Sequence, residues 1–358
     1  MPEIDLKATA QKRSIEKRVA LALAAALLAL ATTLSMAVSV EAASASAVVV
    51  MYHRFGEPAH PSTNITVEQV DAHIAELITG GYSVLPMPEI IARVASGEML
   101  PDRTVGITID DAYRSVFFVA WPRFRAADLP FTVFISTTPL DQGLSNYMSW
   151  DQVRVLAASG VTIGHHTVTH LHMAAATFDR NRREIEGAFQ RYEKELNLRP
   201  TLFAYPYGET SKALSKFIKL GGFKAAFGQH SGIIGSIDDM FYLPRFAMNE
   251  KYGSIERFRL AVNALPLPVT DVTPVDHLIT SPNPPAMGFT VKDGIAGLDR
   301  LACFASQEGR ATLERLGPTR IEIRVKQPFP KGRSRVNCTL RTKQGRWRWL
   351  GWQYYRAP

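Results

Sequence analysis

The 358-residue sequence contains no glycine-rich loop of the dinucleotide or Walker type, so nothing in it supports a nucleotide-binding site. No internal repeat is evident either. Cysteine is scarce: Cys303 and Cys338 are the only two, and both lie in the last quarter of the chain. Two thiols so placed form one disulfide in an oxidising compartment, whereas in a reducing one they remain buried free cysteines.

Charged residues are absent from Val19 to Val40, an alanine- and leucine-rich stretch of 22 residues that follows a basic segment. This length exceeds the roughly 20 residues that a helix needs to cross a bilayer. The basic flank predicts a cytoplasmic N-terminus with the rest of the chain exported, and the small residues at 42–47 resemble a cleavage site. Residues 1–46 are therefore predicted to hold a cytoplasmic stub and either a signal anchor in the inner membrane or a cleaved signal peptide. A buried core helix is the alternative.

Export would place the protein on the periplasmic or cell-surface side, and it has two consequences. A disulfide between Cys303 and Cys338 becomes the expected state of the two thiols. Nucleic acid is excluded as a partner, so the positive charge of the chain calls for another explanation.

Acidic residues are scarce in the C-terminal quarter, where residues 271–358 hold 15 Lys and Arg against 7 Asp and Glu. This excess of 8 equals the net charge of the whole chain. Prolines at 266–285 predict a linker, and the alternating apolar runs that follow predict a basic, antiparallel β module at 286–358. Such a module suits an anionic polysaccharide or a membrane surface.

Two pairs of aromatic residues alternate near the end of this module. Trp347 and Trp349 share one face of a strand, and Trp352 and Tyr354 form a second pair. Core packing accounts for at least one face. The other reading is that Trp347 and Trp349 form a platform on which sugars stack.

Strand-like and helix-like segments alternate from residue 47 to about 265, which predicts a parallel sheet with helical crossovers. Seven or eight short strands in this length favour a barrel over an open, doubly wound sheet, which is the alternative. We therefore predict an α/β fold, a distorted (β/α) barrel of the seven-stranded type over residues 47–265, followed by the small antiparallel β module.

Polar residues follow four of the predicted barrel strands. They are His53, the pair Asp110 and Asp111, the run His165 to His170, and the run Tyr205 to Gly208. Polar groups that converge from several strand ends are typical of a barrel active site. Taken alone, the aspartate pair also fits a helix N-cap.

His166 and His170 are four residues apart, a spacing at which two imidazoles can reach one cation from a helical turn. With one carboxylate they form a ligand set that leaves positions open for water and substrate. Zinc is the first candidate for this divalent metal, and cobalt, nickel or manganese are alternatives. A solvated pair on a helix face is the competing interpretation, and His165 and His172 crowd the same stretch.

The motifs resemble those of the polysaccharide deacetylases, the family of carbohydrate esterases with NodB homology. The match rests on Ile107–Asp111, Gly164–His170, Phe203–Gly208, Val50–Arg54 and Leu243–Arg245, and it covers about residues 47–265. The resemblance implies that Asp111, His166 and His170 hold a metal and that Asp110 is the general base for a metal-activated water. It further implies that the backbone N–H of Tyr207 binds the oxyanion, that Tyr205 contributes to substrate binding and that Arg245 pairs with Asp110.

The sequence departs from the family pattern at several positions. Ala112 replaces the usual glycine after the aspartates, and Ala204 replaces the arginine that usually opens the third motif. No clear leucine-x-histidine motif supplies the catalytic acid, and His277 falls in the predicted linker. His230 and His53 are the remaining candidates for this acid, which the leaving amine requires.

The expected function is thus metal-dependent removal of N-acetyl groups from an amino-sugar polysaccharide by an exported, membrane-tethered hydrolase. An esterase acting on O-acetyl groups is one alternative. A protein that keeps the barrel and binds polysaccharide without catalysis is another.

Overall fold

The structure is a computed structural model, and it describes residues 45–237 and 239–358. The predicted signal segment at 19–40 lies outside these residues. Within the described ranges, no helix combines the length and the apolar character needed to cross a membrane.

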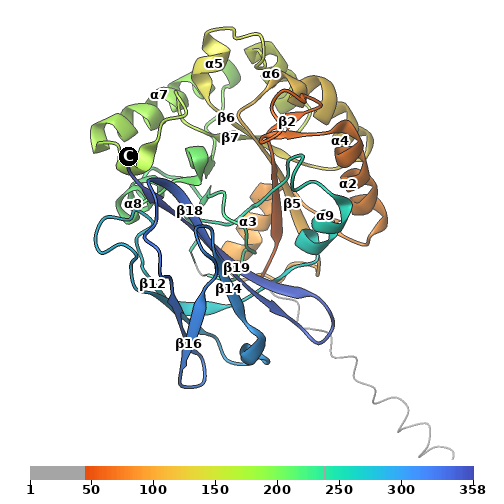
Figure 1. The fold of residues 1–358 in the computed structure, drawn as a ribbon. Helices are drawn as coiled ribbons and strands as arrows, with labels where there is room; N and C mark the ends of the chain where they lie inside the picture. The colour runs from red at the N-terminus through yellow and green to blue at the C-terminus, as the bar shows by residue number, and fades with distance from the viewer. Residues whose placement is uncertain (1–44, 238) are drawn as a thin grey trace, which may run out of the picture. The chain divides into compact units, whose positions relative to one another are not determined.

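A parallel sheet forms the first part of the fold (Figure 1). Its strand order is β10-β1-β5-β6-β7-β8-β9, with β4 added beside β5. The strands are β1 (Val48–Tyr52), β4 (Ser83–Val84), β5 (Thr104–Asp110), β6 (Thr132–Ile135), β7 (Thr162–His165), β8 (Leu202–Ala204), β9 (Ala225–Phe227) and β10 (Phe246–Ala247). The predicted distorted barrel is confirmed. Its two edge strands are bridged by one segment, because Leu243 pairs with Phe227 of β9 and β10 pairs with β1 three residues later.

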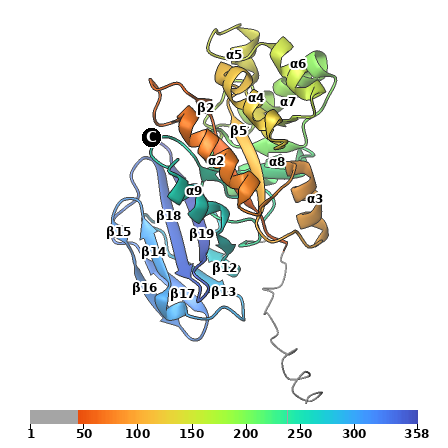
Figure 2. The same ribbon diagram turned by 90° about the vertical axis from the view of Figure 1, so that its right-hand side faces the viewer.

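Helices lie outside the curled sheet (Figures 1 and 2). They are α2 (Val67–Thr79), α3 (Met87–Ser96), α4 (Trp121–Ala126), α5 (Thr137–Asp141), α6 (Trp150–Ala158), α7 (Phe178–Leu196), α8 (Lys212–Leu220) and α9 (Ile255–Val262). Helix α4 follows a single π-helical segment, Val116–Ala120, so the helix expected at 112–125 starts later than predicted. Thr66 and Ser149 begin α2 and α6 with capping boxes, in which each side chain accepts a hydrogen bond from the glutamine backbone three residues on.

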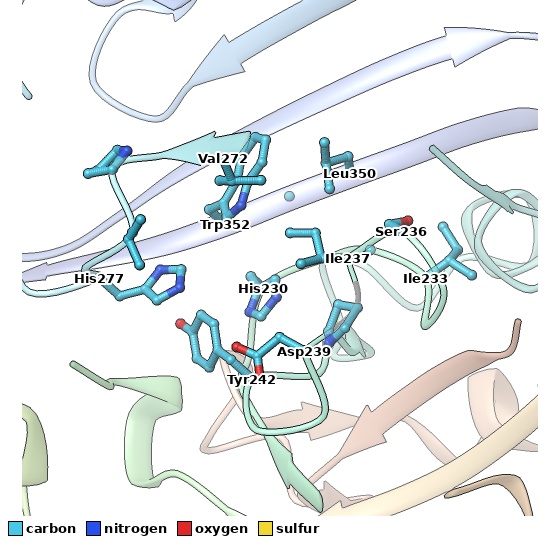
Figure 3. A pocket seen from close by; sticks show the side chains of 15 residues that line it. His230, Ile233, Ser236, Ile237, Asp239, Tyr242, Val272, His277, Leu350 and Trp352 are labelled. Carbon is cyan, nitrogen blue, oxygen red and sulfur yellow. The ribbon is translucent and has the colours of Figure 1, made fainter. Parts of the chain in front are cut away.

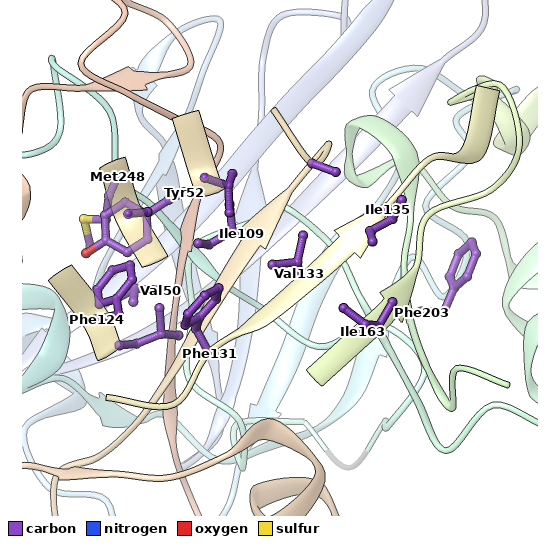
Figure 4. Packing of buried hydrophobic residues seen from close by; sticks show 14 of the residues in the cluster. Val50, Tyr52, Ile109, Phe124, Phe131, Val133, Ile135, Ile163, Phe203 and Met248 are labelled. Atoms are coloured by element: carbon purple, nitrogen blue, oxygen red, sulfur yellow. The ribbon is translucent and has the colours of Figure 1, made fainter. Parts of the chain in front are cut away.

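The barrel core explains why its strands are almost wholly apolar. Every residue of β1, β5 and β6 is buried, as expected for parallel strands covered on both faces. Figure 4 shows Val50, Ile109, Val133 and Ile163 stacked from neighbouring strands, with Phe124 of α4 packed against them. Polar groups are thereby restricted to the ends of the strands.

Two antiparallel sheets follow the barrel. One has the order β11-β19-β18-β14-β15 and the other β12-β13-β17-β16. The strands are β11 (Leu265–Pro266), β12 (Val269–Thr273), β13 (Met287–Val291), β14 (Ala302–Ala305), β15 (Gly309–Arg310), β16 (Thr312–Leu316), β17 (Arg320–Arg324), β18 (Gly332–Arg341) and β19 (Trp347–Arg356). Cys303 and Cys338 are direct neighbours across β14 and β18, and they form the expected disulfide.

One detail differs from the expectations. The predicted linker at 266–285 begins with parts of β11 and β12, because Leu267 and Val269 are buried in the core of the C-terminal sheets. The proline-rich composition thus concealed two strands.

Candidate active site

Asp111 and His166 come directly after β5 and β7, with β6 between them. Both residues extend the sheet by one hydrogen bond each: the Asp111 N–H donates to the Phe134 carbonyl at 3.0 Å, and the His166 N–H donates to the Ile135 carbonyl at 3.1 Å. Parallel strands thereby deliver the carboxylate and the imidazole to the same end of the barrel.

The loop after β7 brings His170 back to the same place. The His170 N–H donates to Thr167 Oγ1 at 3.0 Å, and both residues have a left-handed backbone, with φ of 57° and 72°. The buried carboxylate of Glu184 on α7 accepts hydrogen bonds from the N–H groups of Val168 and Thr169 at 3.0 and 2.7 Å. His170 therefore lies on a loop that these hydrogen bonds hold in place, and not on a continuous helical face.

The three predicted ligands converge. The ligand atoms of Asp111, His166 and His170 lie within 4.8 Å of one another. Asp111 Oδ1 is 3.4 Å from His166 Nε2 and 3.3 Å from His170 Nε2. The competing interpretations, a helix N-cap and a solvated histidine pair, do not explain this convergence.

The protonation of His166 fits a metal ligand. Its Nδ1 lies 2.7 Å from the Ala204 carbonyl, which accepts a hydrogen bond from it and leaves Nε2 free to coordinate. That Nε2 is buried and makes no hydrogen bond within the described part of the chain. A buried polar atom without a partner is costly, and a cation placed between Nε2 and Asp111 would satisfy it.

The pKa values of the three predicted ligands reflect their burial and their short distances from one another. Burial acts to raise the pKa of Asp111, but His166 and His170 outweigh it and hold that pKa well below its usual range. Burial lowers the pKa of His170 to about 4. Asp111 is thus a carboxylate and His170 a neutral imidazole near neutral pH, the forms that bind metals.

Asp110 does not join this cluster but pairs with Arg245, which lies in the segment that bridges the two edge strands of the barrel. Arg245 Nη1 and Nη2 donate to the two Asp110 oxygens at 2.7 and 2.8 Å, and both side chains are fully buried. Arg245 also donates to the Gly228 carbonyl and to Thr108 Oγ1. Burial acts to raise the pKa of Asp110, but Arg245, together with His166 and His53, lowers it by more, so the carboxylate is ionised.

Tyr207 sits beside this centre in a strained conformation. Its φ is 59°, and its ring lies 4.3 Å from the His170 ring and stacks on His172 at 3.9 Å between centroids. Gly208 follows with φ of 68°, where a Cβ would approach the Gln229 nitrogen to 2.5 Å, so only glycine fits. The Tyr207 carbonyl accepts a hydrogen bond from Gln353 Nε2 of β19 at 2.8 Å.

Left-handed backbone is concentrated here. Of the nine non-glycine residues with positive φ within residues 45–237 and 239–358, five belong to the site: Asp111, Ala112, Thr167, His170 and Tyr207. Such residues cost free energy and cluster at functional sites. Ala112, with φ of 54°, stands where the resembling family usually has glycine, and its backbone conformation explains that preference.

The two candidate acids differ in position. His53 Nε2 lies 3.9 Å from Asp110 Oδ2, and the His53 side chain is 14% exposed. His230 is buried, and its ring lies with Tyr242 and His277 at a small cavity beneath β19 (Figure 3). Burial holds the pKa of His230 well below its ordinary value, so it is neutral and has no proton to donate. The placement favours His53, and His277, expected in a linker, is a buried core residue.

Not all of the residues predicted to contact substrate are exposed. The Tyr205 side chain is fully buried and donates from its hydroxyl to the Phe241 carbonyl at 2.9 Å, so it does not face substrate. Trp347 and Trp349 are partly exposed, whereas Trp352 and Tyr354 on the other face are core residues. Trp349 packs edge-on against Phe246 of the barrel, with ring centroids 5.3 Å apart.

Sequence reasoning missed the contribution of the C-terminal strands to the site. Gln353 of β19 contacts Tyr207, and Arg333 of β18 lies 5.5 Å from the Tyr207 ring and 3.8 Å from the buried carboxylate of Glu209 in the barrel. No motif marks these residues, because their role depends on how β18 and β19 pack on the barrel.

Comparison with known proteins agrees with the motifs. Residues 97–226 match the family model described as polysaccharide deacetylase. A curated protein of Bacillus subtilis (strain 168), named "Putative polysaccharide deacetylase YxkH", is 21% identical over 197 residues, which cover 55% of this chain and 69% of that protein.

Solved structures share the fold. The Streptococcus pyogenes deacetylase PplD, determined in complex with acetate, has a TM-score of 0.56 at 20% identity and covers 61% of this chain and 98% of its own. A de-N-acetylase from Aggregatibacter actinomycetemcomitans has a TM-score of 0.52 at 19% identity and covers 60% of this chain and 99% of its own. The resemblance suggested by the motifs is confirmed, in that residues 97–226 match the model of a hydrolase family, the polysaccharide deacetylases, and the fold agrees with solved members.

Proposed function

We propose that the chain is an exported, metal-dependent hydrolase that removes N-acetyl groups from an amino-sugar polysaccharide. The observation that carries this proposal is the buried, unsatisfied Nε2 of His166, which faces Asp111 and His170 beside the Asp110–Arg245 pair. Export is inferred from the uncharged segment at 19–40 and its basic flank.

One divalent cation, zinc being the first candidate, would be held by Asp111, His166 and His170. When bound there, it would supply Lewis acidity, which lowers the pKa of a water molecule and polarises a carbonyl group. The carbonyl of Ala204 orients His166 for this task through Nδ1.

Asp110 would accept the proton of the attacking water. Arg245 holds both carboxylate oxygens, so it keeps Asp110 ionised and fixes the direction of its remaining lone pairs. Water would attack the carbonyl carbon of the N-acetyl group, and the backbone N–H of Tyr207 would donate to the oxygen that becomes negative.

His53 would return a proton to the nitrogen as the carbon–nitrogen bond breaks, yielding acetate and a free amine. It lies beside Asp110, and it is open enough to solvent to regain its proton after each turnover. The N-acetyl specificity is an analogy with the Aggregatibacter de-N-acetylase, whose name states that activity.

The test is release of acetate from N-acetylglucosamine oligomers by the full-length protein, with and without a chelator. Chelator-sensitive release is expected, and Asp110→Asn should reduce kcat by about 1,000-fold while bound metal, measured by elemental analysis, is retained. Release from O-acetylated oligomers alone would replace this proposal with an esterase. Failure to bind any metal would overturn the ligand assignment and favour a non-catalytic binding protein.

A further inference from the structure

A groove of about 720 Å³ lies beside the candidate active site, between barrel segments and strands β18 and β19. Its volume is in the range typical of ligand-binding sites. The barrel side includes His53 and Arg257 of α9, and the opposite side includes Arg333, Arg335 and Trp349.

The groove is positively charged. Three arginines line it, Arg257, Arg333 and Arg335, and no carboxylate does among the residues that the structure describes. Arg333 and Arg335 are two apart on β18, so their side chains leave the same face of the sheet. Like charges placed together without counter-charge repel, and an anionic ligand would remove that cost.

The arginines differ in the partners that the chain offers them. Arg333 Nε lies 3.8 Å from Glu209 Oε1, a carboxylate already engaged by His172. Arg257 lies over the Trp349 ring at 5.0 Å, a contact that leaves its positive charge uncompensated. Within the described residues, neither Arg257 nor Arg335 forms an ion pair.

The groove leads to the reacting groups. His53 lines it and also lies 3.9 Å from Asp110. Arg333 lines it and also lies 5.5 Å from the ring of Tyr207. A polymer lying in the groove would therefore extend one of its sugars to the metal ligands while its neighbours pass the arginines.

We propose that the groove binds an anionic stretch of the substrate, with carboxylate or phosphate groups on sugars next to the one that loses its acetyl group. This inference rests on the proposed function and specifies its substrate class. Guanidinium groups match both anions through paired hydrogen bonds, whereas a neutral polysaccharide would leave Arg257 and Arg335 without a counter-charge. A recess suits a chain-like ligand better than the flat surface of a membrane.

The experiment uses the full-length protein and two matched oligosaccharides. One alternates N-acetylglucosamine with glucuronate, and the other is the same oligomer after reduction of its carboxylates to neutral alcohols. At low salt the charged oligomer should have the lower KM, and added salt should erase the difference. An oligomer carrying phosphate diesters instead of carboxylates shows which anion is preferred.

Arg335→Gln should raise KM about fivefold for the charged oligomer, the loss expected for one charged contact near a surface, and leave KM unchanged for the neutral oligomer. Arg310→Gln is the control, because Arg310 is exposed on β15 and does not line the groove. Equal KM values for charged and neutral oligomers, or an unchanged preference in Arg335→Gln, would overturn the proposal.

Direct binding separates this proposal from the proposed function. Titration calorimetry with the charged oligomer should show affinity that depends on Arg335 even if no acetate is released, in which case the proposed function fails and the groove assignment stands. The last measurement is binding to vesicles of anionic phospholipid. Arg335-dependent binding to vesicles, without preference for the charged oligomer, would assign the groove to a membrane and reject a polysaccharide.

Discussion

The barrel and the C-terminal sheets both depend on β-strands, but they place their functional residues differently. In the barrel, β1, β5 and β6 are buried along their whole length, so the charged groups of the site lie at the last residue of a strand or after it. In β18, exposed and buried residues alternate, and functional side chains can occupy any outward position. Function is therefore concentrated at strand ends in the first region and dispersed along strands in the second.

The largest expected effect concerns the barrel. Arg245→Gln should lower the free energy of unfolding at pH 7 by about 3–5 kcal/mol, because it leaves the Asp110 carboxylate buried without its cation. The pKa of Asp110 is depressed in the folded protein, so this contribution is present above the ordinary carboxyl pKa and is lost as pH falls through the depressed value.

Urea unfolding at pH 7 measures the destabilisation by Arg245→Gln, and the same measurement on the wild type from pH 4 downward follows the loss of the contribution as pH falls. The double variant Arg245→Gln with Asp110→Asn is the matched control, and it should regain much of the lost stability because no unpaired charge remains. A double variant as unstable as Arg245→Gln alone would mean that the packing of Arg245, rather than its charge, supports the barrel end.

The next effect belongs to the C-terminal sheets. Replacing Cys303 and Cys338 by alanine should cost about 3 kcal/mol of unfolding free energy, because the bridge closes a loop across 35 residues in the unfolded chain. Acetate release at low temperature should remain near the wild-type rate, since neither cysteine contacts the site. Thermal unfolding and the acetate assay together check this, and a large loss of activity would show that the two regions are less separable than their chemistry suggests.

A smaller expected effect concerns the pH dependence of the unfolding free energy, to which a buried histidine of the barrel contributes. His73 is buried, and its pKa is lowered to about 4, because desolvation outweighs its hydrogen bond to the Gly253 carbonyl. The unfolded chain binds a proton at His73 below pH 6.5 that the folded protein excludes until about pH 4. Stability is therefore complete above pH 6.5 and falls by about 1.4 kcal/mol per pH unit below it.

The variant His73→Gln should lack this part of the slope. Chemical denaturation at pH 7.5 and 5.5 gives the comparison, with His60, an exposed histidine, mutated to glutamine as the control. Parallel pH profiles for wild type and His73→Gln would contradict the prediction.

The smallest expected effect concerns the hydrogen bond that joins the C-terminal sheets to the barrel. Gln353→Ala removes the hydrogen bond to the Tyr207 carbonyl and should lower kcat about fivefold, consistent with about 1 kcal/mol for one hydrogen bond. Metal content should stay constant, because Gln353 is not among the proposed metal ligands, whereas KM can change with it because Gln353 is the cross-strand partner of Arg335. Steady-state kinetics and elemental analysis test this. An unchanged kcat would mean that only the barrel, and not β19, contributes to the site.

The difference between the regions also explains what the sequence revealed. The proposed metal ligands, Asp110 and Arg245 were all predictable, since each lies at or after a strand end, or in the segment that bridges the edges, of a recognisable parallel fold. The contributions of Gln353 and Arg335 were not, because their positions depend on the packing of one sheet on another, which no local pattern encodes. Tyr205 was assigned to substrate through its motif, although its strand-end position turns its side chain into the core.

The contact between Gln353 and Tyr207 has a consequence for the order in which the enzyme is made. Ribosomes synthesise the barrel before β19, so a nascent chain holds all three metal ligands before the residue that fixes the Tyr207 loop exists. Under the proposed function, a chain that ends before β19 would carry the three ligands without the hydrogen bond that holds the Tyr207 carbonyl. Loss of the last strand would therefore impair the site without removing any residue of the barrel.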